Sequence, residues 1–197
     1  MASLRPPSAQ QKVDTSLLLA DLMARYRVAG APICVDFRIL ASYAKLGDQY
    51  THQVHPYPGK LLASIAGFFL RASTLTPRPG LVLDPFCGSG TVALETSLVG
   101  LQPMVADVNP MAHLITRVKT TPYDPLALLH EVTKIARVAR RLKSAPEIPL
   151  VNGHIWYSPK RKSSLERLLR AIHRCSQPSS LDFFLLCFSV AARRLSN

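Results

Sequence analysis

The sequence has few acidic residues and no closely spaced cysteines. Twelve Asp and Glu stand against 24 Lys and Arg in 197 residues, which gives a formal net charge of +12. The four cysteines, Cys34, Cys87, Cys175 and Cys187, form no Cys-x-x-Cys pair. The sequence therefore predicts neither a disulfide framework nor a zinc site, and we expect reduced thiols in or near the core.

Long hydrophobic runs are also absent. The longest apolar stretch, Leu61 to Leu70, is too short to cross a bilayer, and no charged-then-apolar leader opens the chain. A hydrophobic content of 48% argues against disorder. We expect a cytoplasmic protein without a membrane segment, with a lead-in, helix and strand over residues 1–49 and one ligand-binding domain over 50–197.

The most informative stretch is Leu81 to Thr91, Leu-Val-Leu-Asp-Pro-Phe-Cys-Gly-Ser-Gly-Thr. Apolar β-formers end at Asp84, a turn with two glycines follows, and an apolar-periodic helix is expected from Thr91 to Leu98. A strand, a tight loop and a helix place bare backbone at the carboxyl end of a strand, where open α/β sheets bind ligands.

The glycines alone do not identify the ligand, because Gly88-x-Gly90-x-x-Ala93 also fits the dinucleotide fingerprint. The carboxylate of Asp84 would repel a pyrophosphate and attract an ammonium or sulfonium group. A P-loop is excluded because no Lys follows the second glycine. The best-matched ligand is S-adenosylmethionine, with a nicotinamide dinucleotide as an alternative.

A second acid follows the next predicted strand, from Pro103 to Asp107. A carboxylate at that strand tip can accept hydrogen bonds from both ribose hydroxyls of a nucleoside. Asn109 and Pro110 then supply the cap and first-turn proline of a helix to Lys119. The alternative is that Asp84 and Asp107 only cap helices.

Basic residues concentrate in one stretch of the chain. Between Glu131 and Arg174 there are eleven Lys or Arg and three Glu. Such a cluster is typical of a polyanion binder, and we interpret it as a nucleic-acid surface. The alternative is a solvated helix face.

The rest of the chain is predicted to be mainly helical. We expect a lead-in over 1–13, a strand over 33–38, and helices over 14–28, 61–71, 125–142, 163–174 and 181–195, the last buried on all sides. Trp156 is a candidate core anchor. In the loop 50–60, His52 and His55 are expected to be hydrogen-bonded rather than metal ligands, because no third ligand lies at a useful spacing. That loop forms either a wall of the ligand pocket or a turn made rigid by proline.

Three segments together resemble the amino-methylating DNA methyltransferases: Asp84 to Thr91, Asp107-Val108-Asn109-Pro110, and His55 to Lys60. The resemblance covers about residues 50–120. It implies a Rossmann-like α/β sheet, S-adenosylmethionine as cofactor, and DNA as substrate, with RNA possible. The cofactor-binding residues it implies are Tyr57, Pro58, Lys60, Asp84, Pro85, Phe86, Cys87, Gly88, Ser89, Gly90, Thr91, Asp107 and Asn109.

One motif of that family is missing. Its chemistry needs a loop of Asp, Asn or Ser followed by Pro-Pro and an aromatic residue, and this sequence has no such tetrapeptide. An exocyclic amine is a poor nucleophile until the base is flipped, stacked and hydrogen-bonded there. We therefore assign no catalytic residue and no metal. We expect an incomplete sheet with helical additions at both ends, encoded by a truncated or split coding sequence. Such a chain should be poorly soluble or should be completed by a second polypeptide.

Overall fold

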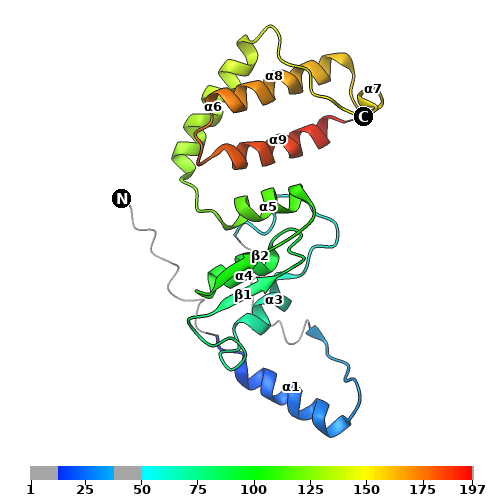
Figure 1. Cartoon of the computed structure of the whole chain (residues 1–197), viewed down its shortest axis with the longest axis vertical. Helices are drawn as coiled ribbons and strands as arrows, with labels where there is room; N and C mark the ends of the chain where they lie inside the picture. The colour runs from blue at the N-terminus through cyan, green and yellow to red at the C-terminus, as the bar shows by residue number, and fades with distance from the viewer. Residues whose placement is uncertain (1–12, 38–49, 197) are drawn as a thin grey trace. The chain divides into compact units, whose positions relative to one another are not determined.

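The computed structural model describes residues 13–37 and 50–196 and divides the chain into two units, Met1–Thr120 and Thr121–Asn197. The first unit carries both strands, and the described part of the second is built from helices alone (Figure 1). Residues 1–12 of the expected lead-in and the domain boundary at residue 49 lie outside the described residues. That boundary stays a prediction.

Two parallel strands with a helix between them form the centre of the first unit. Strand β1 (Leu81–Asp84) pairs with β2 (Gln102–Val105), and helix α4 (Thr91–Leu98) connects them. Gly100, with φ at 78°, ends the helical segment. The predicted order of strand, loop and helix is confirmed, and the described part of the sheet has two strands.

The second strand ends earlier than predicted. Asp107 lies two residues beyond β2, because its Oδ1 accepts a hydrogen bond from the N–H of Asn109 at 2.9 Å and turns the chain. The loops after the two strands stay joined beyond the ladder. The Ala106 N–H donates to the Asp84 carbonyl at 2.9 Å, and the Cys87 N–H donates to the Ala106 carbonyl at 3.0 Å.

One face of this sheet exposes large apolar side chains. Leu83 and Met104 are opposite each other in the register, and they are 62% and 52% exposed. Leu81, on the same side of β1, is 57% exposed. The strands thus bury only one face, and the other has no covering layer among the described residues.

Helices α3 (Ala63–Leu70), α4 and α5 (Pro110–Thr120) supply the packing of the first unit. Helix α4 contacts both strands and both neighbouring helices. Ala66 and Leu70 of α3 pack with Val99 and Leu101, which flank the end of α4 and the start of β2. The helix that was predicted over 61–71 is therefore present with slightly shorter bounds.

Helix α1 (Ser16–Ala29) occupies the place predicted for the first helix and ends at Gly30 in the left-handed region. It buries none of its residues, so it contributes no core face. Its start is fixed to α3 by Thr15, whose Oγ1 donates to the Phe68 carbonyl at 2.5 Å. The strand predicted over 33–38 is wrong for residues 33–37, and residue 38 lies outside the described residues.

The second unit packs α6 (Pro125–Arg141), α8 (Pro159–Cys175) and α9 (Leu181–Leu195), with a short α7 (Gly153–Trp156). Helix α8 contacts both of the other long helices. Its core contains Ile135, Ala171, Ile172, Cys175 and Phe184. Asp124 caps α6 by accepting from the Leu126 N–H at 3.0 Å.

Three expectations for this unit are wrong. Helix α8 starts four residues before the predicted Ser163, because Ser158 caps it and Pro159 occupies its first turn. Trp156 is 54% exposed and anchors no core. Helix α9 has the predicted bounds but fully buries only Phe184 and Leu186, because it packs against α8 on one side.

A buried carboxylate connects α6 to the turn between α8 and α9. Glu131 is 8% exposed, and its Oε2 accepts from the Ser180 hydroxyl at 2.6 Å and from the Gln177 N–H at 3.0 Å. These bonds replace the water that the carboxylate loses on burial. They also fix the position at which α9 begins.

The cysteines divide evenly between core and surface. Cys87 and Cys175 are buried as expected, whereas Cys34 and Cys187 are exposed. Among the described residues, no helix combines the length and apolar character needed to cross a bilayer.

Candidate cofactor site

The loop between β1 and α4 is a tight backbone turn held by two glycines. Gly88 and Gly90 have φ values of 47° and 70°, a region that residues with a Cβ rarely adopt. The Gly90 N–H donates to the Cys87 carbonyl at 2.7 Å and closes the turn. Ser89, Gly90 and Thr91 are buried, while Pro85 and Phe86 are exposed.

Asp107 fixes this loop through its carboxylate. The Gly88 N–H donates to Oδ2 at 2.8 Å, and the Asn109 N–H donates to Oδ1 at 2.9 Å. These bonds from Asn109 and Gly88 hold the pKa of the Asp107 carboxyl below its ordinary value, so the group is ionised at neutral pH. The carbonyl of Asp107 also accepts from His113 Nε2 at 2.7 Å.

The two acids singled out in the sequence lie at the same sheet edge, Asp84 as the last residue of β1 and Asp107 in the loop after β2. Asp84 is half-buried, and its Oδ1 accepts from the Phe86 N–H at 3.1 Å. Burial and the Asp107 and Asp84 charges raise the pKa of the Cys87 thiol, which therefore stays protonated. Negative charge thus concentrates where parallel strands present their ligands.

Local capping accounts for part of these contacts. Asp84 and Asp107 each accept from the backbone two residues ahead, and Asn109 Oδ1 accepts from the Met111 N–H at 2.9 Å at the start of α5. The bond from Asp107 to Gly88, however, crosses nineteen positions in the sequence. Capping alone does not explain that bond.

Tyr57 reaches the glycine loop from the preceding segment. A Cβ placed on Gly88 would lie 3.3 Å from Tyr57 Cε1, so the ring packs directly against the glycine. Tyr57, Gly88 and Asp107 are therefore brought together. Pro58 is exposed and Lys60 is half-buried, and their roles at the loop stay predictions.

The segment that carries Tyr57 is anchored by a buried ion pair. His52 is 1% exposed, and its Nε2 donates to Glu95 Oε1 of α4 at 2.9 Å. Arg71 donates from Nη1 to Glu95 Oε2 at 3.0 Å. Burial raises the pKa of Glu95, but the bonds from His52 and Arg71 outweigh it and leave the pKa below its ordinary value.

Helix α5 supports the same loop from behind. Thr116 Oγ1 lies 3.6 Å from Cys87 Sγ and donates to the Gly88 carbonyl at 3.5 Å. A Cβ on Gly90 would lie 2.5 Å from that hydroxyl, so α5 approaches as closely as a glycine allows.

Sequence reasoning missed Glu95 and Thr116 as supports of the loop. The only local signal for each residue was a polar side chain on the apolar side of its helix, Glu95 in α4 and Thr116 in α5. His52 is hydrogen-bonded, as predicted, and no group of three metal-ligating side chains occurs among the residues that the structure describes.

Comparison with known proteins gives one matching family and two relatives. The family described as RMKL-like, methyltransferase domain, matches residues 50–144. The chain is 25% identical to the Type II methyltransferase M.MvaI of Kocuria varians over 161 residues. It is 32% identical to the Type II methyltransferase M.MjaII of Methanocaldococcus jannaschii over 76 residues.

Both matches are partial. The first covers 76% of this chain and 35% of the relative, and the second covers 39% of this chain and 14% of the relative. The chain thus spans about a third or less of the curated relatives that it matches. No solved structure gives a significant match. The family match includes the glycine loop, Asp107 and the anchored segment that carries Tyr57.

Proposed function

We propose that this chain, which belongs over part of its length to the S-adenosylmethionine-dependent DNA methyltransferases, binds S-adenosylmethionine at the loop between β1 and α4. The observation that carries the proposal is the bond from the Gly88 N–H to Asp107 Oδ2 at 2.8 Å. In a dinucleotide site the glycine loop must approach a pyrophosphate. Here a carboxylate already takes that N–H, which favours a cation over a phosphate.

The same carboxylate retains capacity for a ribose. An ionised carboxylate offers about four acceptor positions, and the two backbone N–H groups take one on each oxygen of Asp107. Two positions therefore remain for the two ribose hydroxyls. Because its pKa is lowered, Asp107 stays an acceptor throughout the neutral range.

The other end of the cofactor would lie toward Asp84 and Tyr57. The sulfonium is attracted by the Asp84 carboxylate, which terminates β1. The Tyr57 ring and the exposed ring of Phe86 supply apolar surface beside the loop, in keeping with the mostly apolar lining of cofactor sites. The remaining predicted residues, from Pro85 to Thr91, shape the backbone of the loop. In this proposal β1 and β2 are two strands of a larger Rossmann-like sheet.

The proposed reaction is methyl transfer to an exocyclic amino group of adenine or cytosine in DNA. A Pro-Pro-aromatic loop, absent from this sequence, would be supplied by a second polypeptide segment. The exposed apolar face with Leu83 and Met104 supports that arrangement, because uncovered sheet faces of this kind mark interaction surfaces. An alternative favoured by the same absence is a subunit that binds cofactor and nucleic acid without catalysis.

Two measurements separate these possibilities. Calorimetry should detect binding of S-adenosylmethionine and none of NAD, and Asp107→Ala should abolish the binding. Transfer of tritiated methyl to unmodified duplex DNA is then assayed with the chain alone and with a candidate partner chain. We expect transfer only with the partner. Transfer by the chain alone would contradict the incomplete site, and NAD binding without S-adenosylmethionine binding would overturn the cofactor assignment.

A further inference from the structure

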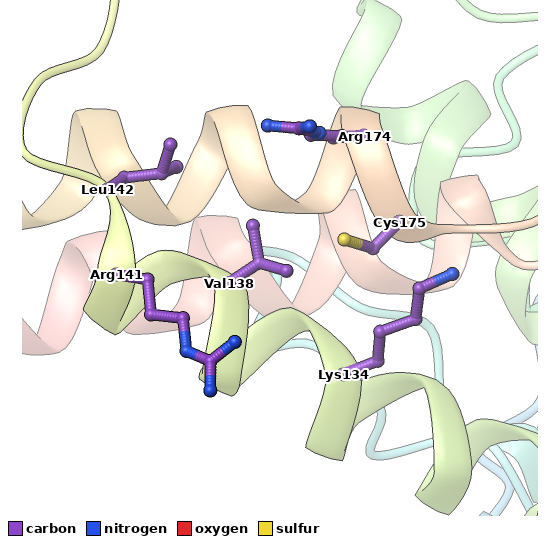
Figure 2. A pocket seen from close by; sticks show the side chains of 6 residues that line it. All are labelled: Lys134, Val138, Arg141, Leu142, Arg174 and Cys175. Atoms are coloured by element: carbon purple, nitrogen blue, oxygen red, sulfur yellow. The ribbon is translucent and has the colours of Figure 1, made fainter.

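A charged groove lies between two helices of the second unit, separate from the glycine loop. Its volume is about 450 Å³, within the range of ordinary ligand pockets. Helix α6 contributes Lys134, Val138 and Arg141, Leu142 lines the groove directly after that helix, and helix α8 contributes Arg174 and Cys175 (Figure 2). In that view Val138 and Cys175 lie between the charged side chains.

The three cations of this groove have no anionic partner among the described residues. Lys134, Arg141 and Arg174 are exposed, and none forms an ion pair or a side-chain hydrogen bond in residues 13–37 and 50–196. Two glutamates of the same unit are already paired with other residues. Glu131 is bonded to Ser180, and Glu147 pairs with Lys162. Three unneutralised cations around one groove favour an anionic ligand.

The spacing of these cations suits an extended anion. Lys134 and Arg141 are seven residues apart on α6, which places them about 10 Å apart along the helix axis. Arg174 lines the same groove from α8. Two of the three are arginines, whose planar guanidinium matches the geometry of a phosphate. Duplex DNA carries one charge about every 3.4 Å per strand, so more than one phosphate fits this span.

Positive charge also continues beyond the groove. Arg137 and Arg140 of α6 and Lys143 just after it are exposed and, within the described residues, have no ion-pair or hydrogen-bond partner. A short acidic peptide would be matched by the groove alone. A charge that extends over the second half of α6 and onto Lys143 fits a long polyanion better.

We propose that the groove between α6 and α8 binds the phosphodiester backbone of DNA through Lys134, Arg141 and Arg174. The identity of the polyanion rests on the proposed function, whereas the site itself lies in the unit that does not carry the cofactor loop. These contacts carry no base specificity, because phosphate contacts position a protein on DNA without reading its sequence.

The test compares two triple variants of the full chain with equal loss of charge. The groove variant is Lys134→Gln, Arg141→Gln and Arg174→Gln. The control variant is Lys160→Gln, Arg193→Gln and Arg194→Gln, which replaces exposed residues of α8 and α9 outside the groove lining. Binding of a labelled DNA duplex is measured by fluorescence anisotropy across a salt series.

The groove variant should reduce the slope of log affinity against log salt by about 2.7, since each phosphate contact contributes about 0.9. Raising salt from about 50 to about 200 mM then costs the unmodified chain about 40-fold more affinity than this variant. The control variant should keep most of the slope. Arg174→Gln alone should reduce it by about 0.9, which provides the readout should the triple variant unfold.

Equal slopes for the groove and control variants would overturn the proposal. So would a groove variant that loses binding of polyglutamate while its DNA slope is unchanged, because the occupant would then be an acidic protein. Calorimetry with S-adenosylmethionine on the same preparations tests the proposed function separately. Both variants should bind it as the unmodified chain does.

Discussion

Replacing Gly90 by Ala tests how closely α5 approaches the glycine loop. Gly90 has φ at 70°, and an added Cβ would lie 2.5 Å from Thr116 Oγ1 and 2.9 Å from Thr116 Cβ and Cγ2. Thr116 cannot move its own Cβ away without shifting the helix backbone. The left-handed conformation costs about 1–2 kcal/mol and the overpacking about 1–3 kcal/mol. The free energy of unfolding should therefore fall by about 2–5 kcal/mol.

Gly100→Ala is the matched control for backbone strain. Gly100 has φ at 78°, and nothing lies within 4 Å of its added Cβ. Gly100→Ala should lower the free energy of unfolding only by the cost of the left-handed conformation, about 1–2 kcal/mol. Urea unfolding of the full-length variants gives both values. Gly90→Ala should also weaken S-adenosylmethionine binding, because Thr116 bonds to the Gly88 carbonyl, whereas Gly100→Ala should leave it unchanged.

A double variant separates the contact from other effects. Thr116→Ala removes the hydroxyl and methyl groups nearest to the added Cβ, so it should recover part of the stability lost in Gly90→Ala. Equal destabilisation by Gly90→Ala and Gly100→Ala, with no recovery in the double variant, would refute the close approach of α5 to the loop.

Three further predictions concern the loop and the two cores. Backbone bonds keep the pKa of Asp107 below its ordinary 3.8, so its contribution to stability is complete above that pH and is lost as pH falls further. Asp107→Asn should remove this acid dependence in urea unfolding measured from neutral to acidic pH. Glu95→Gln breaks a buried pair and should cost about 3 kcal/mol or more, against less than about 1 kcal/mol for Lys162→Gln in an exposed pair. Equal costs would contradict the anchoring of the segment before Tyr57. Phe184→Ala should cost about 3–5 kcal/mol in thermal or urea unfolding, because its side chain is buried between helices. Trp156→Ala, at a 54% exposed position, should have little effect, and the reverse order would show that the second core is elsewhere.

Local signals in the sequence predicted most elements correctly. Asp124 followed by Pro125 is a cap and a first-turn proline, and α6 begins where that pair places it. Ser158 and Pro159 give the same signal, and the predicted start at Ser163 was wrong because it followed apolar periodicity instead. The bounds of α4 and the end of β1 at Asp84 were equally readable.

Contacts between distant residues could not be predicted in this way. The pair between His52 and Glu95 joins positions 43 residues apart, and neither residue carries a motif that names the other. The bond from Gly88 to Asp107 likewise depends on parallel pairing of β1 with β2. The sequence placed both acids near the sheet edge, but only the structure shows that one of them holds the glycine loop.

The exposed Trp156 shows a second limit. Its size made it a candidate for the core, but it ends a four-residue helix outside the three packed long helices. Burial depends on which helices meet, and composition does not report that. Helix α9 shows the same limit. It carries apolar residues on several sides, but it packs against α8 on one side and fully buries only Phe184 and Leu186.

We propose that the glycine loop held by Asp107 binds a cationic nucleoside cofactor. Calorimetric titration of the purified chain with S-adenosylmethionine, and of its Asp107→Ala variant under the same conditions, tests it most directly. We expect saturable binding to the unmodified chain and none to the variant. Equal binding by both proteins, or binding of NAD in place of S-adenosylmethionine, would contradict it.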